Sequence, residues 1–346
     1  MEMFKPKFTI TNKLTASLVK IERTRGFLDA ARLSDTWIAK MQAKSLILEA
    51  HYTTHIEGTH LTLEQSEKLL TGHKIANVDP DDVRELLNYQ KAFDLVADYL
   101  GSGEPIRETV LREIHKRLVE GVRGNSAAPG EYRKVQNYVA NSKTKEIIYT
   151  PPSAFQVPQM MSELMNWLNV EQEINPVLIA GIAQFQLVHI HPFLDGNGRS
   201  ARLLSMLYLY KTGYDFKRLF TISEYYDRDR PSYYKAIQSV RNSNMDMTEW
   251  LEYFANGLSI QLEEIQSRGE QIIKLDIITI QFNLSNREKK IIEHLLEHNE
   301  LAIKNFQILF PETSKRTLQR ELRNLCDLGL LRVIGSTIDR HYVINY

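Results

Sequence analysis

The segment from His191 to Arg202 decides the fold, and it reads HPFLDGNGRSAR. Two glycines bracket Asn197, so the backbone there can adopt unusual dihedral angles and approach a ligand closely. The loop runs directly into an expected helix over 197–212, whose first N–H groups would point at one spot. A helix N-terminus behind a glycine loop is suited to binding phosphates.

The side chains of this segment add reactive chemistry. Arg199 and Arg202 are three residues apart on the expected helix and share a face, where their guanidinium groups can grip phosphate oxygens. Asp195 offers a carboxylate there, the usual way to hold Mg²⁺ together with substrate oxygens. His191 titrates near neutral pH, as a general base should. His189 and His191 could instead be a metal pair, but no third ligand stands at useful spacing, so a nucleotide site is favoured.

The composition is typical of a soluble globular protein with roughly two or three domains. The 346 residues carry a formal net charge of +0, so no global field attracts nucleic acid or a membrane. The single cysteine, Cys326, excludes an intrachain disulfide and suits a cytoplasmic protein. We expect no signal peptide, because residues 1–6 lack an apolar h-region. We also expect no membrane span, because the most apolar window, 178–190, is short and interrupted by polar residues.

The spacing of apolar residues predicts a mainly helical chain. Segment 36–57 has apolar positions at helical spacing and ends at Gly58, and Thr62 with Gln65 forms a capping box for the next helix. Further helices are expected at 80–100, 106–121, 156–170, 176–189, 197–212, 230–243 and 246–270. Two β-prone runs, 130–139 and 147–152, flank a polar turn at 141–144 and predict a hairpin.

The last part of the sequence has a different pattern. We expect a linker and entry strand over 272–284. Helices are expected to follow at 285–298, 301–309 and 315–328, and a closing hairpin is expected from the strands 330–334 and 340–344. Three helices followed by a β-wing, which turns at Gly335-Ser336, predict a winged helix-turn-helix domain.

Helix 315–328 carries the charge that bears on a partner of this domain. Its basic side chains are expected on the exposed side: Lys315, Arg316, Arg320 and Arg323. Leucines at 318, 322 and 325 form the buried stripe, while Glu312, Glu321 and Asp327 dilute the basic patch. Both DNA and a protein therefore stay open as partners of residues 313–346.

The segment 191–202 matches every defined position of the Fic signature, H-P-F-x-[DE]-G-N-G-R-x-x-R, and the chain resembles Fic-family protein adenylyltransferases. Residues 130–133, GEYR, with the hairpin after them, are similar to the family's flap, which holds a target peptide by strand addition. The segment Thr53–Gly58 matches the inhibitory motif [ST]-x-x-x-E-[GN] of the class whose inhibitory helix precedes the core. The resemblance implies a helical region at 1–100, a Fic core at 101–270 and a winged helix at 271–346.

This resemblance implies transfer of AMP from ATP, with Mg²⁺, to a Ser, Thr or Tyr hydroxyl of a target protein or of the chain itself. His191 would be the base, and Asp195 would hold Mg²⁺. The phosphates would be bound by Gly196, Asn197, Gly198, Arg199 and Arg202. The nucleotide would be lined by the flap residues Asn137, Tyr138, Val139 and Ala140, and Tyr225 and Tyr226 could stack on adenine.

The inhibitory motif implies a regulated enzyme. Glu57 would pair with Arg202 and leave ATP unbound or in a non-reactive pose, with Thr53 and Gly58 completing the motif. Several alternatives stay open: removal of AMP with Glu57 positioning a water, a nucleotide-sensing DNA-binding transcription regulator, and a transferase that uses another nucleotide or a phosphocholine donor. A homodimer is also open, and no membrane partner is expected.

Overall fold

The computed structural model describes residues 4–99, 104–140, 144–170, 173–298, 300–302, 305, 308–335 and 340–345. The chain forms two compact units: Met1–Ala30 with Ser34–Ile265, and Ala31–Leu33 with Gln266–Tyr346. Residues 1–100 and most of 101–270, predicted as two domains, thus pack together in the first unit. In the described ranges, no helix is long and apolar enough to cross a membrane.

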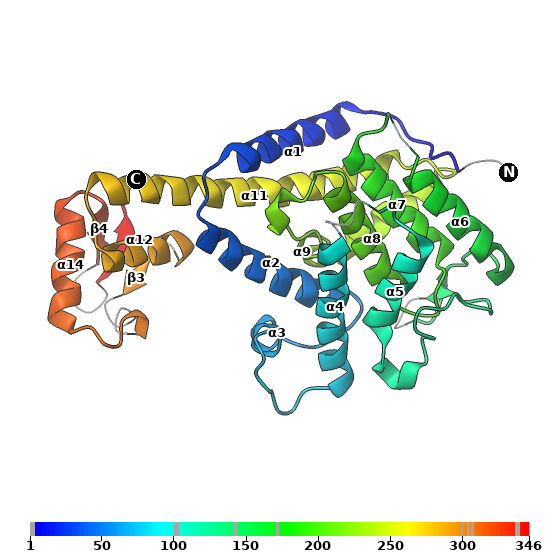
Figure 1. The fold of residues 1–346 in the computed structure, drawn as a ribbon, viewed down its shortest axis with the longest axis horizontal. Helices are drawn as coiled ribbons and strands as arrows, with labels where there is room; N and C mark the ends of the chain where they lie inside the picture. The colour runs from blue at the N-terminus through cyan, green and yellow to red at the C-terminus, as the bar shows by residue number, and fades with distance from the viewer. Residues whose placement is uncertain are drawn as a thin grey trace. The chain divides into compact units, whose positions relative to one another are not determined.

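Two helices form the centre of the first unit (Figure 1), namely α7 (Pro176–Ile190) and α8 (Asn197–Lys211). Asn175 starts α7 by accepting a hydrogen bond from the Val177 N–H, and Pro176 suits the first helical position. Almost every residue of α7 is buried, so the predicted buried helix is confirmed. The pair brackets the His191 segment and fixes both of its ends.

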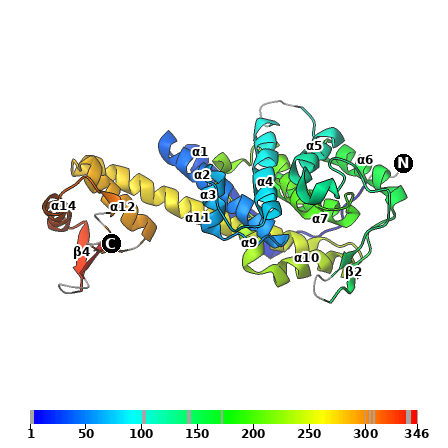
Figure 2. The same cartoon turned by 90° about the horizontal axis from the view of Figure 1, so that it is seen from below.

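Other helices of the first unit surround this pair. In chain order they are α1 (Asn12–Ala30), α2 (Asp35–Ile56), α3 (Leu63–Leu70), α4 (Pro80–Tyr99), α5 (Glu108–Val119), α6 (Val157–Leu168), α9 (Ser223–Arg228) and α10 (Arg230–Asn242). Helix α2 packs against α4 and α9, and α5 and α6 pack together (Figure 2). The predicted capping box of Thr62 and Gln65 is present at the start of α3. The predicted hairpin is also present, with β1 (Val139–Ala140) antiparallel to β2 (Ile147–Tyr149), while part of its turn, 141–143, lies outside the described residues.

The second unit combines helices with a small antiparallel sheet. Its elements are α12 (Asn286–His298), β3 (Leu301–Ala302), α14 (Lys315–Asp327), β4 (Leu331–Ile334) and β5 (His341–Ile344), with strand order β3-β5-β4. The predicted helices at 285–298 and 315–328 and the closing hairpin are present. The helix predicted over 301–309 is wrong at its start, because Leu301 and Ala302 pair with β5. Residues 303, 304, 306, 307 and 336–339 lie outside the described part.

The prediction of a linker and entry strand over 272–284 is wrong. Helix α11 runs from Thr248 to Gln281, and Asn283 then leaves the helix with a left-handed φ of 51°. Leu275 is buried in the core of the second unit, and Ile272, Ile278 and Phe282 pack partly against it. These residues recur every three to four positions, so burial of one helical stripe overrides the β propensity of the isoleucine-rich run.

Candidate active site

The loop between α7 and α8 is closed by its own side chains. His191 ends α7 in a left-handed conformation with φ 51° and ψ 58°, and its N–H donates to the Leu187 carbonyl. The Asn197 side chain bridges the loop, because its Oδ1 accepts from Phe193 N–H and its Nδ2 donates to the Phe193 carbonyl, both at 2.9 Å. Asn197 therefore shapes the loop with its side chain and leaves its backbone at the helix N-terminus.

The two glycines of the loop are required for different structural reasons. Gly196 has a φ of 74°, and a Cβ atom there would lie 2.9 Å from Val119 Cγ1. Gly198 is in the first turn of α8, and a Cβ there would collide with the Glu57 carboxylate. Neighbouring side chains therefore approach the backbone closely at both positions, and close approach to a ligand stays a prediction. At Gly198 the approaching group is the side chain of Glu57, the residue that follows α2.

His191 is held as a neutral base. Burial lowers its pKa to about 4, against smaller opposing effects of the Val188 carbonyl and the Glu57 carboxylate. Its Nδ1 lies 3.2 Å from the Val188 carbonyl, so an Nδ1–H tautomer leaves Nε2 free to accept a proton. At neutral pH the imidazole can therefore act as a general base.

Arg133 fixes the backbone around His191. This buried guanidinium donates to the carbonyls of His191 (2.9 Å), Val135 (3.2 Å) and Pro152. The Arg133 N–H also donates to the Pro192 carbonyl at 2.9 Å. One side chain thereby joins the end of α7 to both sides of the hairpin. Arg133 belongs to the GEYR segment, and no local pattern in the sequence indicates this role.

The guanidinium of Arg202 is bound by residues at the C-terminal end of helix α2. Its Nη2 lies 2.7 Å from Glu57 Oε1, while its Nε and Nη2 donate to Thr53 Oγ1 at 2.7 Å and to the Thr53 carbonyl at 3.1 Å. Arg202 is only 1% exposed and Glu57 is 29% exposed. The helix ends at Ile56, and Gly58 follows with a φ of 108°. The predicted contact between Glu57 and Arg202 is therefore present.

Arg199 does not face an open site. Its Nη1 pairs with Glu85 Oε2 at 2.7 Å, and both side chains are 2% exposed. Its Nη2 lies 3.8 Å from Asp195 Oδ1. Glu85, on α4, was not singled out from the sequence, although it determines where Arg199 points. Of the two arginines expected at phosphates, Arg199 is committed to a buried carboxylate in this conformation.

Asp195 is the one motif carboxylate near the loop. It is 45% exposed, its Oδ1 accepts from the Gly196 N–H at 2.6 Å, and its Oδ2 lies 3.2 Å from Arg123 Nη1. Among the residues the structure describes, no group of three or more His, Cys, Asp or Glu side chains could hold a metal by itself. A single exposed carboxylate suits Mg²⁺ that arrives with phosphate oxygens. The donor set therefore fits a metal shared with a nucleotide.

The flap is tied to the same loop. Asn137 Nδ2 donates to the Phe193 carbonyl at 3.0 Å, and Val139 and Ala140 form β1 opposite Tyr149 and Ile147. Tyr138 is 54% exposed. The structure thus brings Asn137 next to the His191 segment, while Val139 and Ala140 lie in the hairpin and Tyr138 is exposed.

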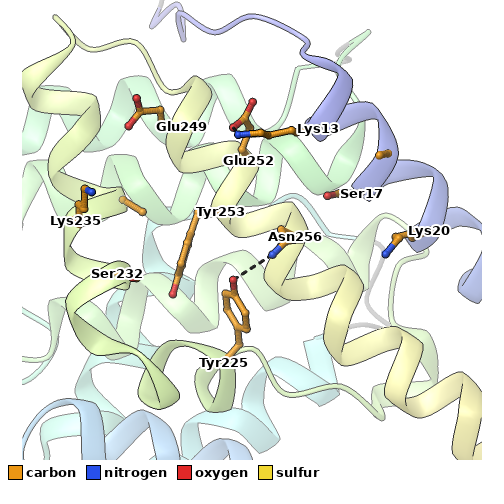
Figure 3. Close-up of a pocket in the computed structure, with 12 residues that line it drawn as sticks. Lys13, Ser17, Lys20, Tyr225, Ser232, Lys235, Glu249, Glu252, Tyr253 and Asn256 are labelled. Atoms are coloured by element: carbon orange, nitrogen blue, oxygen red, sulfur yellow. Dashed lines mark hydrogen bonds and ion pairs between the residues drawn. The ribbon is translucent and has the colours of Figure 1, made fainter.

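The predicted tyrosines do not form a base site. Tyr226 is fully buried and stacks on Tyr233 at 4.3 Å between ring centroids, so it cannot contact a nucleotide. Tyr225 packs on Gly257 and accepts a hydrogen bond from Asn256 Nδ2 at 3.2 Å (Figure 3). It lines a cavity of about 640 Å³ bounded by α1, α10 and α11. Tyr225 therefore lines this cavity, while Tyr226 lies in the core, where the charge of Arg202 acts on it.

Two other side chains near the motif are not indicated by any pattern in the sequence. Arg241, on α10, lies 3.5 Å from the Tyr149 ring centroid and helps to lower the pKa of His191 after the effect of burial. Tyr234 is 51% exposed, and the Glu57 carboxylate is among the charges that act on it. Both lie on α10, which carries no recognisable motif, so only the fold brings them to the site.

Known proteins share sequence similarity with the part of the chain that carries this site. The model of the Fic/DOC family matches residues 105–209. The protein adenylyltransferase Fic of Culex quinquefasciatus is 30% identical over 199 residues, covering 56% of this chain and 38% of that protein. The relative of the same name in Drosophila grimshawi is 30% identical, covering 57% and 40%. The chain thus spans about two fifths of the length of these curated relatives.

Solved structures share the fold. A Fic family protein from Desulfovibrio desulfuricans has a TM-score of 0.66 at 18% identity, covering 99% of this chain and 98% of that chain. Fic-1 from C. elegans has a TM-score of 0.61 at 22% identity, covering 76% and 73%. The family model covers the hairpin, α7, the His191 segment and most of α8. Residues 105–209 of this chain are therefore similar to the Fic/DOC family, and the chain shares the fold of solved Fic proteins.

Proposed function

We propose that this chain is a protein adenylyltransferase, which transfers AMP from ATP to Ser, Thr or Tyr hydroxyls of target proteins. One observation carries the proposal: a half-buried His191, whose pKa is lowered to about 4, directly precedes the glycine-containing loop that leads into helix α8. A base beside an anion-binding helix N-terminus suits attack of a hydroxyl on a phosphate. The curated relatives are named protein adenylyltransferase Fic, which supports the same reaction.

The proposed step is an in-line substitution at the α-phosphate of ATP. His191 Nε2 takes the proton of the target hydroxyl, a bond forms from that oxygen to the α-phosphorus, and the bond to the oxygen that bridges to the β-phosphate breaks. Pyrophosphate leaves with the bonding electrons. The N–H groups at the start of α8 bind phosphate oxygens, so the chain contributes position and electrostatic stabilisation.

Asp195 is the residue that would hold Mg²⁺. When bound, Mg²⁺ would neutralise charge on the phosphates of ATP. The hydrogen bond from the Gly196 N–H orients the Asp195 carboxylate. Arg202 would stabilise the outer phosphates of ATP once Glu57 leaves it.

A protein substrate fits the flap better than a small molecule does. The strands β1 and β2 form a two-stranded hairpin beside the loop, and Tyr138, Ile147 and Ile148 are each more than half exposed. A two-stranded hairpin leaves main-chain groups free to pair with an extended peptide. A target hydroxyl would thereby be presented to His191 with little dependence on its sequence.

Labelled ATP tests this proposal. Full-length Glu57→Gly protein is incubated with ATP labelled at the α-phosphate, and in parallel with ATP labelled at the γ-phosphate. We expect protein-bound label only from the α-labelled donor, and none with the Glu57→Gly/His191→Ala variant. Label from the γ-phosphate would indicate a phosphotransferase, and label from CDP-choline in place of ATP would indicate a different donor.

A second candidate is DNA binding by the second unit, as in a nucleotide-sensing regulator. The observation that favours it is the charge on α14, where Glu321 is 7% exposed and pairs with Arg287 at 2.8 Å. Glu321 therefore does not dilute the exposed face, whose basic residues are Lys315, Arg316, Arg320 and Arg323. Such a face fits the phosphates of duplex DNA.

A further inference from the structure

Arg123 makes an ion pair with the carboxylate proposed to hold the metal. Its Nη1 lies 3.2 Å from Asp195 Oδ2, and its Nη2 lies 2.8 Å from Glu85 Oε1. Its side chain is 56% exposed, and it comes from a short turn between α5 and the flap. Arg123 is far from the signature in sequence, and the reaction described above does not use it.

The turn that carries Arg123 is shaped to aim it at this spot. Arg123, Gly124 and Asn125 all have left-handed φ values, of 44°, 68° and 62°. A left-handed conformation is disfavoured for an arginine by roughly 1 kcal/mol. The Asn125 side chain closes the turn on the Gly121 N–H, and Asp81 Oδ1 accepts from the Arg123 N–H at 3.3 Å. The backbone position of Arg123 is therefore fixed by its surroundings.

The two carboxylates that pair with Arg123 differ in their exposure to solvent. Glu85 is 2% exposed and also pairs with Arg199 at 2.7 Å, so it is a fixed anchor. Asp195 is 45% exposed, and an ion pair between two exposed side chains such as this one contributes only about 0.2–1 kcal/mol. When the contacts of Arg123 are perturbed, its ion pair with Asp195 is expected to break before its ion pair with Glu85.

We infer that Arg123 is a positioning residue that occupies the cation position beside Asp195 in the resting protein and yields it to a divalent metal. This inference rests on the proposed function, because it needs Asp195 to be the metal ligand. A guanidinium and a divalent cation repel each other when they share one carboxylate. Arg123 would therefore give up its contact with Asp195 when a divalent metal is bound there, while the ion pair with Glu85 would keep the guanidinium nearby.

Metal binding tests this exchange without measuring transfer. The full chain is saturated with ADP, which lacks the phosphate that Glu57 would exclude, and Mn²⁺ is titrated while free Mn²⁺ is followed by electron paramagnetic resonance. We expect Arg123→Gln to bind Mn²⁺ about two- to fivefold more tightly than wild type, the range of an exposed ion pair. Arg123→Lys keeps the charge and should stay near wild type.

Two further variants make the result specific. Arg117→Gln removes a positive charge that pairs with Glu113 on α5, and it should leave Mn²⁺ affinity unchanged. Asp195→Asn should weaken Mn²⁺ binding, and adding Arg123→Gln to it should then have no effect. Thermal melting of each variant establishes that it is folded.

The outcomes separate the inference from the proposed function. If Asp195→Asn weakens Mn²⁺ binding but Arg123→Gln leaves it unchanged or weaker, the exchange is refuted and the proposed function stands. If Asp195→Asn binds Mn²⁺ as wild type does, the metal role of Asp195 is refuted, and the inference falls with it.

Discussion

Replacing Glu57 by glycine should raise the rate at which the protein transfers AMP. In the resting structure Glu57 Oε1 lies 2.7 Å from Nη2 of the buried Arg202. A hydrogen bond between charged groups contributes about 1.5–3 kcal/mol, which corresponds to roughly 10- to 150-fold in an equilibrium. If this contact opposes a productive ATP pose, Glu57→Gly should raise the rate of AMP transfer by about that factor.

The same change should affect ATP more than ADP. Glu57 competes for the arginine that would bind the outermost phosphate, and ADP lacks that phosphate. Isothermal titration with ATP and with ADP should therefore show tighter binding of ATP to Glu57→Gly and a much smaller change for ADP. Glu57→Gln, which removes the charge but keeps the size, should be intermediate.

The stability of the variant provides an independent check. Arg202 keeps its hydrogen bonds to Thr53 but loses its carboxylate, so Glu57→Gly should lower the free energy of unfolding by about 1–3 kcal/mol. If Glu57→Gly is folded and destabilised in this way, yet transfers AMP no faster than wild type, the autoinhibition argument is refuted.

Three further predictions concern burial, the flap and the second unit. Burial lowers the pKa of His189 to about 4, so as the pH falls below 6.5 the unfolded state takes up a proton before the folded state does. The folded protein therefore loses stability between pH 7 and pH 4, and His189→Gln should remove about 3 kcal/mol of that loss. Urea unfolding of both proteins at pH 7 and at pH 4 measures this difference. Arg133→Lys should slow AMP transfer about 10- to 100-fold with little change in ATP affinity, since lysine cannot hold the His191 carbonyl and the flap together; an unchanged rate would contradict its positioning role. Arg320→Glu with Arg323→Glu should weaken binding to duplex DNA at least about tenfold and flatten its salt dependence; wild type that shows no salt-dependent DNA binding would rule out the DNA role.

Features set by neighbouring residues could be predicted from the sequence. The loop and helix of the His191 segment, the end of α2 before Gly58 and the capping box at Thr62 all depend on residues within a few positions. The Glu57–Arg202 contact is the exception, because it joins positions 145 residues apart. It followed from the family resemblance and not from local pattern.

Features set by packing could not be predicted. Glu85 and Arg123 come from separate parts of the chain, and only the fold brings them to Arg199 and Asp195. The tyrosine pair at 225–226 looked suited to a base, but neighbouring helix positions point in different directions, and Tyr226 is turned into the core. The sequence carries no sign of either arrangement.

The most direct test of the central claim is the mass of the protein after reaction with ATP. Intact-mass spectrometry of Glu57→Gly, followed by peptide mapping, should show the added mass of AMP on a Ser, Thr or Tyr hydroxyl of the chain or of an added target. The Glu57→Gly/His191→Ala variant should show no addition. An equal amount of AMP adduct on the variant without His191, or an adduct of phosphate alone, would contradict the account.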